Sequence, residues 1–177
     1  MMSLTVVFYM YLLLFAIIGS MRGWAKEILV TFAIVLSLFI ITVLETYVGV
    51  VRRIADTGGQ PLFWMEVTTV ILLVFFGYQT PNIRAIAGAR FARERLQDVL
   101  LGFMIGGFNG YLTVGSIWWY LNKAGYPFPI IQAPQPGDPY YEAAVRLINI
   151  LPPEWLTIPW IYFAVGVAFL FVIVVFI

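Results

Sequence analysis

The stretch ILVTFAIVLSLFIITVL, residues 28–44, decides the fold of this chain because it holds no charged side chain over most of the thickness of a bilayer. A helix rises about 1.5 Å per residue, so roughly 20 apolar residues cross a hydrocarbon core about 30 Å thick. Backbone inside lipid must satisfy its own hydrogen bonds, and a barrel strand needs only about ten residues. The length of this run therefore indicates a transmembrane helix.

Four further runs of the same kind lie on either side of it, and each holds hardly any charge: residues 4–18, 62–78, 99–121 and 158–177. The sequence therefore predicts an all-α fold, a polytopic membrane bundle of about five transmembrane helices. We expect residues 1–122 to form a four-helix membrane core, 123–156 a proline-rich extramembrane loop, and 157–177 an additional fifth transmembrane helix.

The composition agrees with a membrane protein and excludes several kinds of chemistry. The chain is 62% hydrophobic and 18% aromatic, with a mean hydropathy of +0.94, which is more apolar surface than a soluble domain of this length can bury. It has no histidine and no cysteine, so it lacks the commonest metal ligand, the usual general base and any thiol. A net charge of +1 gives no basis for nucleic-acid binding. We expect no enzyme activity, catalytic residue, metal site or cofactor, whereas binding of a lipid, quinone or carotenoid stays open.

Arginine and lysine gather in the loops and predict the orientation of the chain. With five spans, the first and third loops share one side and hold the larger group: Arg22, Lys26, Arg84, Arg90, Arg93 and Arg95. The opposite side holds a smaller group: Arg52, Arg53, Lys123 and Arg146. We therefore expect the first group inside and the N-terminus outside. Residues 82–97, the most basic segment, predict an interfacial helix held by its arginines.

The loop at 123–156 predicts one short amphipathic helix. Asp138–Pro139 favours a helix start, with aspartate at the cap and proline at the first position. Apolar residues then recur at i, i+3, i+4 and i+7 on one face: Tyr141, Ala144, Val145 and Ile148. We expect this helix to lie against the membrane surface or the bundle. Residues 171–177 carry no charged flank, so we also expect the natural protein to continue beyond them.

Two motifs stand out between and within the spans. The first is Gly19-Ser-Met-Arg22-Gly23-Trp24-Ala-Lys26-Glu27, and the second is Asp98-Val-Leu-Leu-Gly102-Phe-Met-Ile-Gly106-Gly-Phe-Asn-Gly110. Together they resemble the colicin V production protein family (CvpA), whose members carry an Arg-Gly-aromatic-x-x-Glu turn followed by an Asp-x-x-x-Gly-x-x-x-Gly stretch. The resemblance covers residues 1–122 and departs from the family pattern at Thr5 and Asn109.

The resemblance implies a small multi-pass protein of the bacterial inner (cytoplasmic) membrane, in a family associated with colicin V production and envelope homeostasis. It also implies a structural motif made of residues from both stretches: Arg22, Gly23, Glu27, Asp98, Gly102, Gly106 and Gly110.

The spacing of these residues predicts their physical roles. Gly102, Gly106 and Gly110 lie on one helix face and favour close approach of a second helix backbone. Packing within one subunit is the leading interpretation. The alternatives are a homo-oligomer interface and a groove for a ligand or lipid. Arg22 and Asp98 are costly charges at the edge of the hydrocarbon, so we expect them to form an ion pair, with a proton or ion pathway as the alternative.

Two further groups of side chains have open interpretations. Glu45 and Glu66 lie near span ends on the same predicted side, where they either bind a cation or share a proton, or reach water separately. Tryptophans and a tyrosine at the neighbouring span ends fit an interfacial aromatic belt, with a platform for an apolar ligand as the alternative: Trp118, Trp119, Tyr120, Trp155 and Trp160.

The leading functional hypothesis is a non-enzymatic integral membrane scaffold or accessory protein of the CvpA-like family. Its expected partners are membrane lipids and either other membrane-protein subunits or further copies of itself. An accessory transmembrane subunit of a large photosynthetic or respiratory complex, packing against pigment- or quinone-bearing subunits, is the alternative. A small transporter or channel is a second alternative, and it would depend on the polar residues within the spans: Thr31, Ser37, Thr42, Glu45, Glu66, Thr68, Thr69, Asn109 and Thr113.

Overall fold

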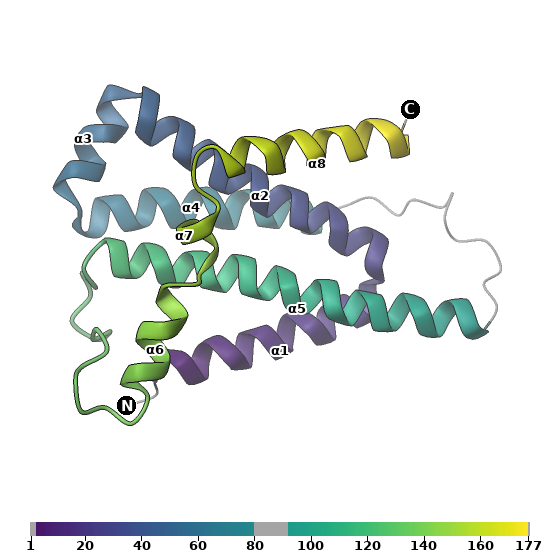
Figure 1. Cartoon of the computed structure of the whole chain (residues 1–177), viewed down its shortest axis with the longest axis horizontal. Helices are drawn as coiled ribbons and strands as arrows, with labels where there is room; N and C mark the ends of the chain where they lie inside the picture. Colours follow the sequence, from purple (N-terminus) through teal and green to yellow (C-terminus); the bar gives the residue numbers. More distant parts are fainter. Residues whose placement is uncertain (1–2, 80–91, 177) are drawn as a thin grey trace.

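The computed structural model describes residues 3–79 and 92–176, and every regular element in these ranges is a helix (Figure 1). The helices are α1 (Leu4–Arg22), α2 (Trp24–Tyr47), α3 (Gly49–Thr57), α4 (Gly59–Tyr78), α5 (Ala92–Lys123), α6 (Tyr141–Ile148), α7 (Pro152–Trp155) and α8 (Trp160–Phe176). The predicted all-α class is confirmed. Helices α1, α2, α4 and α5 contain segments long and apolar enough to cross a membrane. Helix α8 is apolar but has 17 residues, so the fifth span stays a prediction.

The four long helices lie side by side with alternating direction, and α8 packs on the outside of α2 (Figure 1). Helix α5 contacts α1, α2 and α4, and α2 contacts α4, α5 and α8. In α2 the buried side chains recur at helical spacing, at Val30, Ile34, Leu38 and Ile41. They pack against buried residues of α4 and α5, such as Val70 and Leu112. The apolar sequence thus divides into an inner face and an outer face suited to lipid.

Helix α5 is longer than the predicted fourth span. It begins at Ala92, whereas the apolar run that predicted the fourth span begins at residue 99. Its 32 residues extend about 48 Å at 1.5 Å per residue. One end of it projects past α1 and α2 (Figure 1). The predicted interfacial helix at 82–97 is therefore wrong for residues 92–97, because they form the first part of α5. The other residues of that predicted helix, 82–91, lie outside the described ranges.

Two of the connections contain short helices. Residues 49–57, between α2 and α4, form helix α3. The predicted amphipathic helix exists as α6, with Ala144 buried on its inner face, but Asp138 does not cap it. Instead, the Asp138 Oδ2 atom accepts a hydrogen bond of 3.0 Å from the Gln135 N–H, so the aspartate closes the turn that precedes the helix.

The turn between α1 and α2 consists of a single residue, Gly23. Its φ is +86°, a backbone conformation that residues other than glycine rarely adopt. A Cβ atom at this position would also lie 2.8 Å from the Asp98 Oδ1 atom. Both the backbone conformation and the approach of α5 therefore require glycine here.

The glycines of α5 form a close contact with α1, which we call the glycine seam: Gly19, Gly102, Gly106 and Gly110. A Cβ atom on Gly106 would lie 2.5 Å from the Phe15 carbonyl oxygen and 2.8 Å from the Gly19 Cα atom. A Cβ atom on Gly102 would meet the Gly19 carbonyl oxygen, and one on Gly110 would lie 2.8 Å from the Phe15 Cβ atom. The predicted packing within one subunit is confirmed, with α1 as the partner helix.

Adjacent glycines of α5 provide a matched test of the seam. Gly106→Ala should destabilise the protein by about 1–3 kcal/mol, the usual cost of overpacking, because the new methyl group meets backbone atoms that cannot move independently. Gly107→Ala should be neutral or stabilising, since a Cβ atom there lies 3.5 Å from the Ala16 Cβ atom, an ordinary contact. The melting temperatures of both variants in detergent measure the difference, and equal values would contradict a tight seam.

Candidate functional site

Two clusters of charged and polar side chains lie at opposite ends of the bundle. The first, which we call the arginine cluster, is located where α1 ends and α2 begins, and consists of Arg22, Glu27, Thr31, Tyr78 and Asn109. The second, the lysine cluster, is located where α5 ends, and consists of Glu45, Glu66 and Lys123. Because charge inside a bilayer is costly unless it is paired, these clusters are the candidate functional residues of the chain.

The arginine cluster is built around the carboxylate of Glu27, whose side chain has no solvent exposure. The Arg22 Nη1 atom donates to Glu27 Oε1 at 2.6 Å. The Asn109 amide nitrogen lies 2.8 Å from Glu27 Oε2 and 2.9 Å from the Glu27 carbonyl oxygen. Both carboxylate oxygens therefore accept a hydrogen bond, one of them from a cation, as a buried carboxylate requires.

The remaining members of the arginine cluster complete these contacts. The Thr31 hydroxyl donates to the Asn109 Oδ1 atom at 2.7 Å, which fixes the orientation of the amide. The Arg22 Nη2 atom donates to the Tyr78 carbonyl oxygen at 3.1 Å, and the guanidinium carbon lies 4.3 Å from the centre of the Tyr78 ring. One cluster thus joins α1, α2, α4 and α5.

The lysine cluster joins three helices through one ammonium group. The Lys123 Nζ atom of α5 lies 2.7 and 2.9 Å from the two carboxylate oxygens of Glu45 on α2. It also lies 2.7 Å from Glu66 Oε1 on α4. The side chain of Glu66 has no solvent exposure, and its Oε2 atom has no hydrogen-bond partner among the described residues. The interpretation that both carboxylates reach water separately is wrong, because they converge on a cation that the chain itself provides.

The predicted ion pair between Arg22 and Asp98 is wrong in its partner. Within the described ranges, Arg22 pairs with Glu27, and no Arg22–Asp98 ion pair is formed. Asp98 nevertheless lies at the predicted turn, where its Oδ1 atom accepts a 3.3 Å hydrogen bond from the Trp24 N–H at the start of α2. A carboxylate is stabilised there by the partial positive charge of the helix N-terminus. The two motifs therefore meet as expected, through a backbone group of α2.

The structure thus brings all the predicted motif residues to the contact of α1, α2 and α5. Gly23 and Asp98 touch at the turn, Glu27 and Arg22 form the ion pair, and the three glycines of α5 form the seam. Sequence reasoning missed the central role of Asn109 and the cation that joins Glu45 to Glu66. A signal for Asn109 existed, since it is a polar residue inside the glycine stretch of a span.

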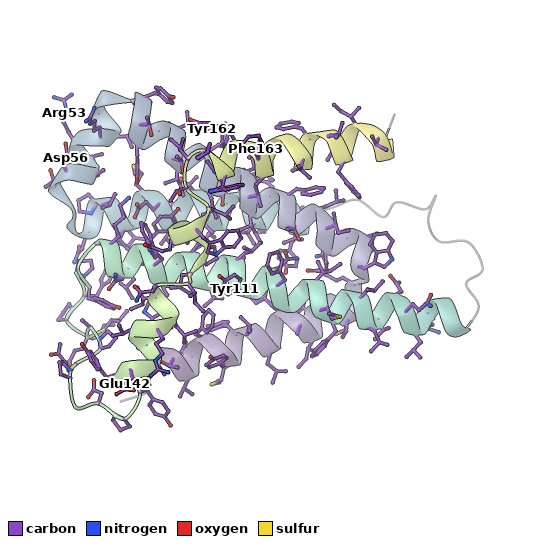
Figure 2. All side chains as sticks on the ribbon, viewed as in Figure 1. Arg53, Asp56, Tyr111, Glu142, Tyr162 and Phe163 are labelled. Carbon is purple, nitrogen blue, oxygen red and sulfur yellow. The ribbon has the colours of Figure 1, made fainter. Side chains whose placement is uncertain are left out.

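The prediction of an interfacial aromatic belt is wrong for two of its five residues. Trp118 and Tyr120 are buried in the bundle, and the Trp118 Nε1 atom donates to the Tyr126 hydroxyl at 3.2 Å. Trp119 and Trp155 use their indole N–H groups to attach the last loop, donating to Glu154 at 3.0 Å and to the Tyr111 hydroxyl at 3.0 Å. Figure 2 shows Tyr111 on α5 beside the α6–α7 segment.

Comparison of the chain with protein-family models, curated proteins and solved structures gives no match. The CvpA-like resemblance therefore rests on the two sequence motifs and stays a prediction. Within the described ranges, no group of three or more histidine, cysteine, aspartate or glutamate side chains is arranged to hold a metal ion. The chemistry that the two clusters provide is pairing of buried charge between helices.

The buried and the exposed ion pairs of this chain should differ in their coupling energy. In a double-mutant cycle, Arg22→Ala and Glu27→Ala should be non-additive by about 2–3 kcal/mol, near the upper end for residues in direct contact, because each single change strands a charge inside the bundle. The control pair Arg146 and Glu142 on α6 is more than four-fifths exposed on both sides and should couple by about 0.3–0.5 kcal/mol. Unfolding free energies in detergent give both values, and equal coupling would contradict the buried arginine cluster.

Proposed function

We propose that this chain is a non-enzymatic integral membrane scaffold or accessory protein, of the kind that the CvpA-like resemblance implies, in the bacterial inner membrane. The proposal rests mainly on the way the chain uses its charges. The arginine cluster joins four helices at one end of the bundle and the lysine cluster joins three at the other. Such charges stabilise one fixed arrangement of the helices, which is what a scaffold needs.

The outer faces of the bundle support the same proposal. Large aromatic side chains of α4 and α8 are exposed, among them Trp64, Phe76 and Phe163; Figure 2 shows Phe163 on α8. In a bilayer, lipid is as apolar as these side chains, so helices of neighbouring proteins associate by close packing and shape. A rigid body with broad aromatic faces suits binding to other membrane-protein subunits or to further copies of itself.

The scaffold proposal predicts an assembly larger than one chain in the native membrane. Extraction of membranes with a bilayer-excising polymer, followed by native mass spectrometry, should give particles whose protein mass exceeds the 20.1 kDa of a single chain. Copies of this chain or other membrane proteins would both satisfy the prediction. Pigment- or quinone-bearing partners would favour the accessory subunit of an energy-converting complex. A single chain surrounded by lipid alone would argue against the proposal.

A second candidate function, a small proton or cation transporter, is favoured by one observation. The Oε2 atom of Glu66 is buried without a hydrogen-bond partner among the described residues, beside the Glu45 carboxylate and the Lys123 ammonium. A carboxylate oxygen of this kind inside a membrane bundle can take part in a proton or cation relay.

Ion flux through proteoliposomes separates the two candidates. The scaffold proposal expects proton, sodium and potassium flux equal to that of protein-free liposomes. The transporter candidate expects a flux that Glu66→Gln lowers at least tenfold, because the amide cannot exchange a proton. Glu142→Gln, an exposed change on α6, should leave such a flux unchanged. A flux with this dependence on Glu66 would overturn the scaffold proposal.

A further inference from the structure

Helix α3 is the one helix of eight or more residues in the described ranges that buries none of its own side chains. Its sequence, Gly-Val-Val-Arg-Arg-Ile-Ala-Asp-Thr, places residues about 100° apart around the helix axis. The apolar residues Val50, Val51, Ile54 and Ala55 therefore share one face. The charged residues share the opposite face: Arg52, Arg53 and Asp56. Thr57, seven residues after Val50, lies about 20° from it at the boundary of the two faces.

The connections of α3 fix its depth. Only Val48 separates it from the end of α2 at Tyr47, and only Gly58 separates it from the start of α4 at Gly59. Since α2 and α4 are both candidate membrane spans, α3 lies within one residue of each span end. Figure 1 shows that it runs across the ends of these helices, in the direction that a helix lying in the bilayer surface requires.

The charges of α3 are arranged for the headgroup region. Arg53 lies about 60° around the helix from Val50, with Thr57 between them, and Arg52 lies about 60° from Ala55. One arginine therefore lies on each side of the apolar face. Asp56 lies between them in the middle of the polar face. Both arginines are exposed, and Figure 2 shows Arg53 and Asp56 pointing away from the bundle. This order brings cations close to lipid phosphates and keeps the carboxylate in water.

We propose that α3 is a membrane-surface anchor whose apolar face enters the bilayer interface and whose two arginines bind anionic phospholipid headgroups. Val51, Ile54 and Ala55 are half-buried and Val50 is 60% exposed. The occupant of the exposed part of the apolar face is lipid, because lipid is the neighbouring phase at this depth. The inference goes beyond the scaffold proposal and does not depend on it.

The absence of native cysteine allows unique spin labels on the full chain. Nitroxides at Val50, Ile54 and Asp56 are compared in liposomes of phosphatidylcholine and phosphatidylglycerol. Labels at the first two positions should collide more with oxygen, and the label at Asp56 more with a water-soluble nickel chelate, because oxygen concentrates in lipid. High nickel access at all three positions would overturn the anchor. Shielding of Val50 from both agents would also overturn it, because it indicates a protein partner on the apolar face. Spin broadening that disappears on dilution with unlabelled protein would overturn it as well, because it indicates a second copy of the chain.

Headgroup selectivity is tested with a fluorophore at Val50 and brominated lipids. Quenching by brominated phosphatidylglycerol should exceed quenching by brominated phosphatidylcholine. The change Arg52→Gln/Arg53→Gln should lower this preference by about fivefold per arginine. Arg146→Gln, which removes an exposed arginine from α6, should leave it unchanged. Equal quenching by the two lipids in the unmodified protein, or a preference that survives the double change, would overturn the role of the arginines. Because α3 has no buried side chain, unchanged melting temperatures verify that the variants are folded.

Discussion

The buried carboxylate of Glu27 is the constraint on which much of the bundle depends. Its side chain has no solvent exposure, so the rest of the structure must supply both charge and hydrogen bonds. The charge comes from Arg22 at the end of α1, and a second donor comes from Asn109 in the middle of α5. These donors can reach one carboxylate only if α1, α2 and α5 approach closely. The glycines on the facing sides of α1 and α5 permit that approach.

The lysine cluster performs the same task at the other end. Lys123 is the last residue of α5, and its ammonium group binds one carboxylate of α2 and one of α4. The glycine seam and the apolar core of α2, α4 and α5 fill the space between the two clusters. The bundle is therefore held by directional polar contacts at both ends and by packing in the middle. In lipid this division is effective, because apolar contacts alone discriminate poorly between helix arrangements.

The segment after α5 belongs to the same body. Trp119 and Trp155 use their indole N–H groups as hydrogen-bond donors between this segment and α5. The Tyr111 hydroxyl adds a hydrogen bond to the Ile150 carbonyl oxygen. Aromatic side chains with one polar atom suit this position, since the ring packs on the bundle while the polar atom forms a hydrogen bond with the other segment. The same end of the molecule carries α3, so the helices that lie across the bundle gather on one side (Figure 1).

The sequence by itself determined the all-α class, the four long helices, the helix α6 and the close contact of the glycine stretch. These features follow from local constraints: backbone in lipid must bond to itself, apolar runs must match the bilayer, and glycines four apart share a face. The tertiary structure decided which charges pair. Arg22 is five residues from Glu27 but Asn109 is 82 residues from it, and Lys123 is 78 residues from Glu45. The sequence placed Arg22 with Asp98 because both lie at one end of the bundle, yet the rotation of each helix about its axis turned Arg22 toward Glu27 and Asp98 toward the start of α2. That rotation is set by packing among all the helices, and spacing along one helix cannot supply it.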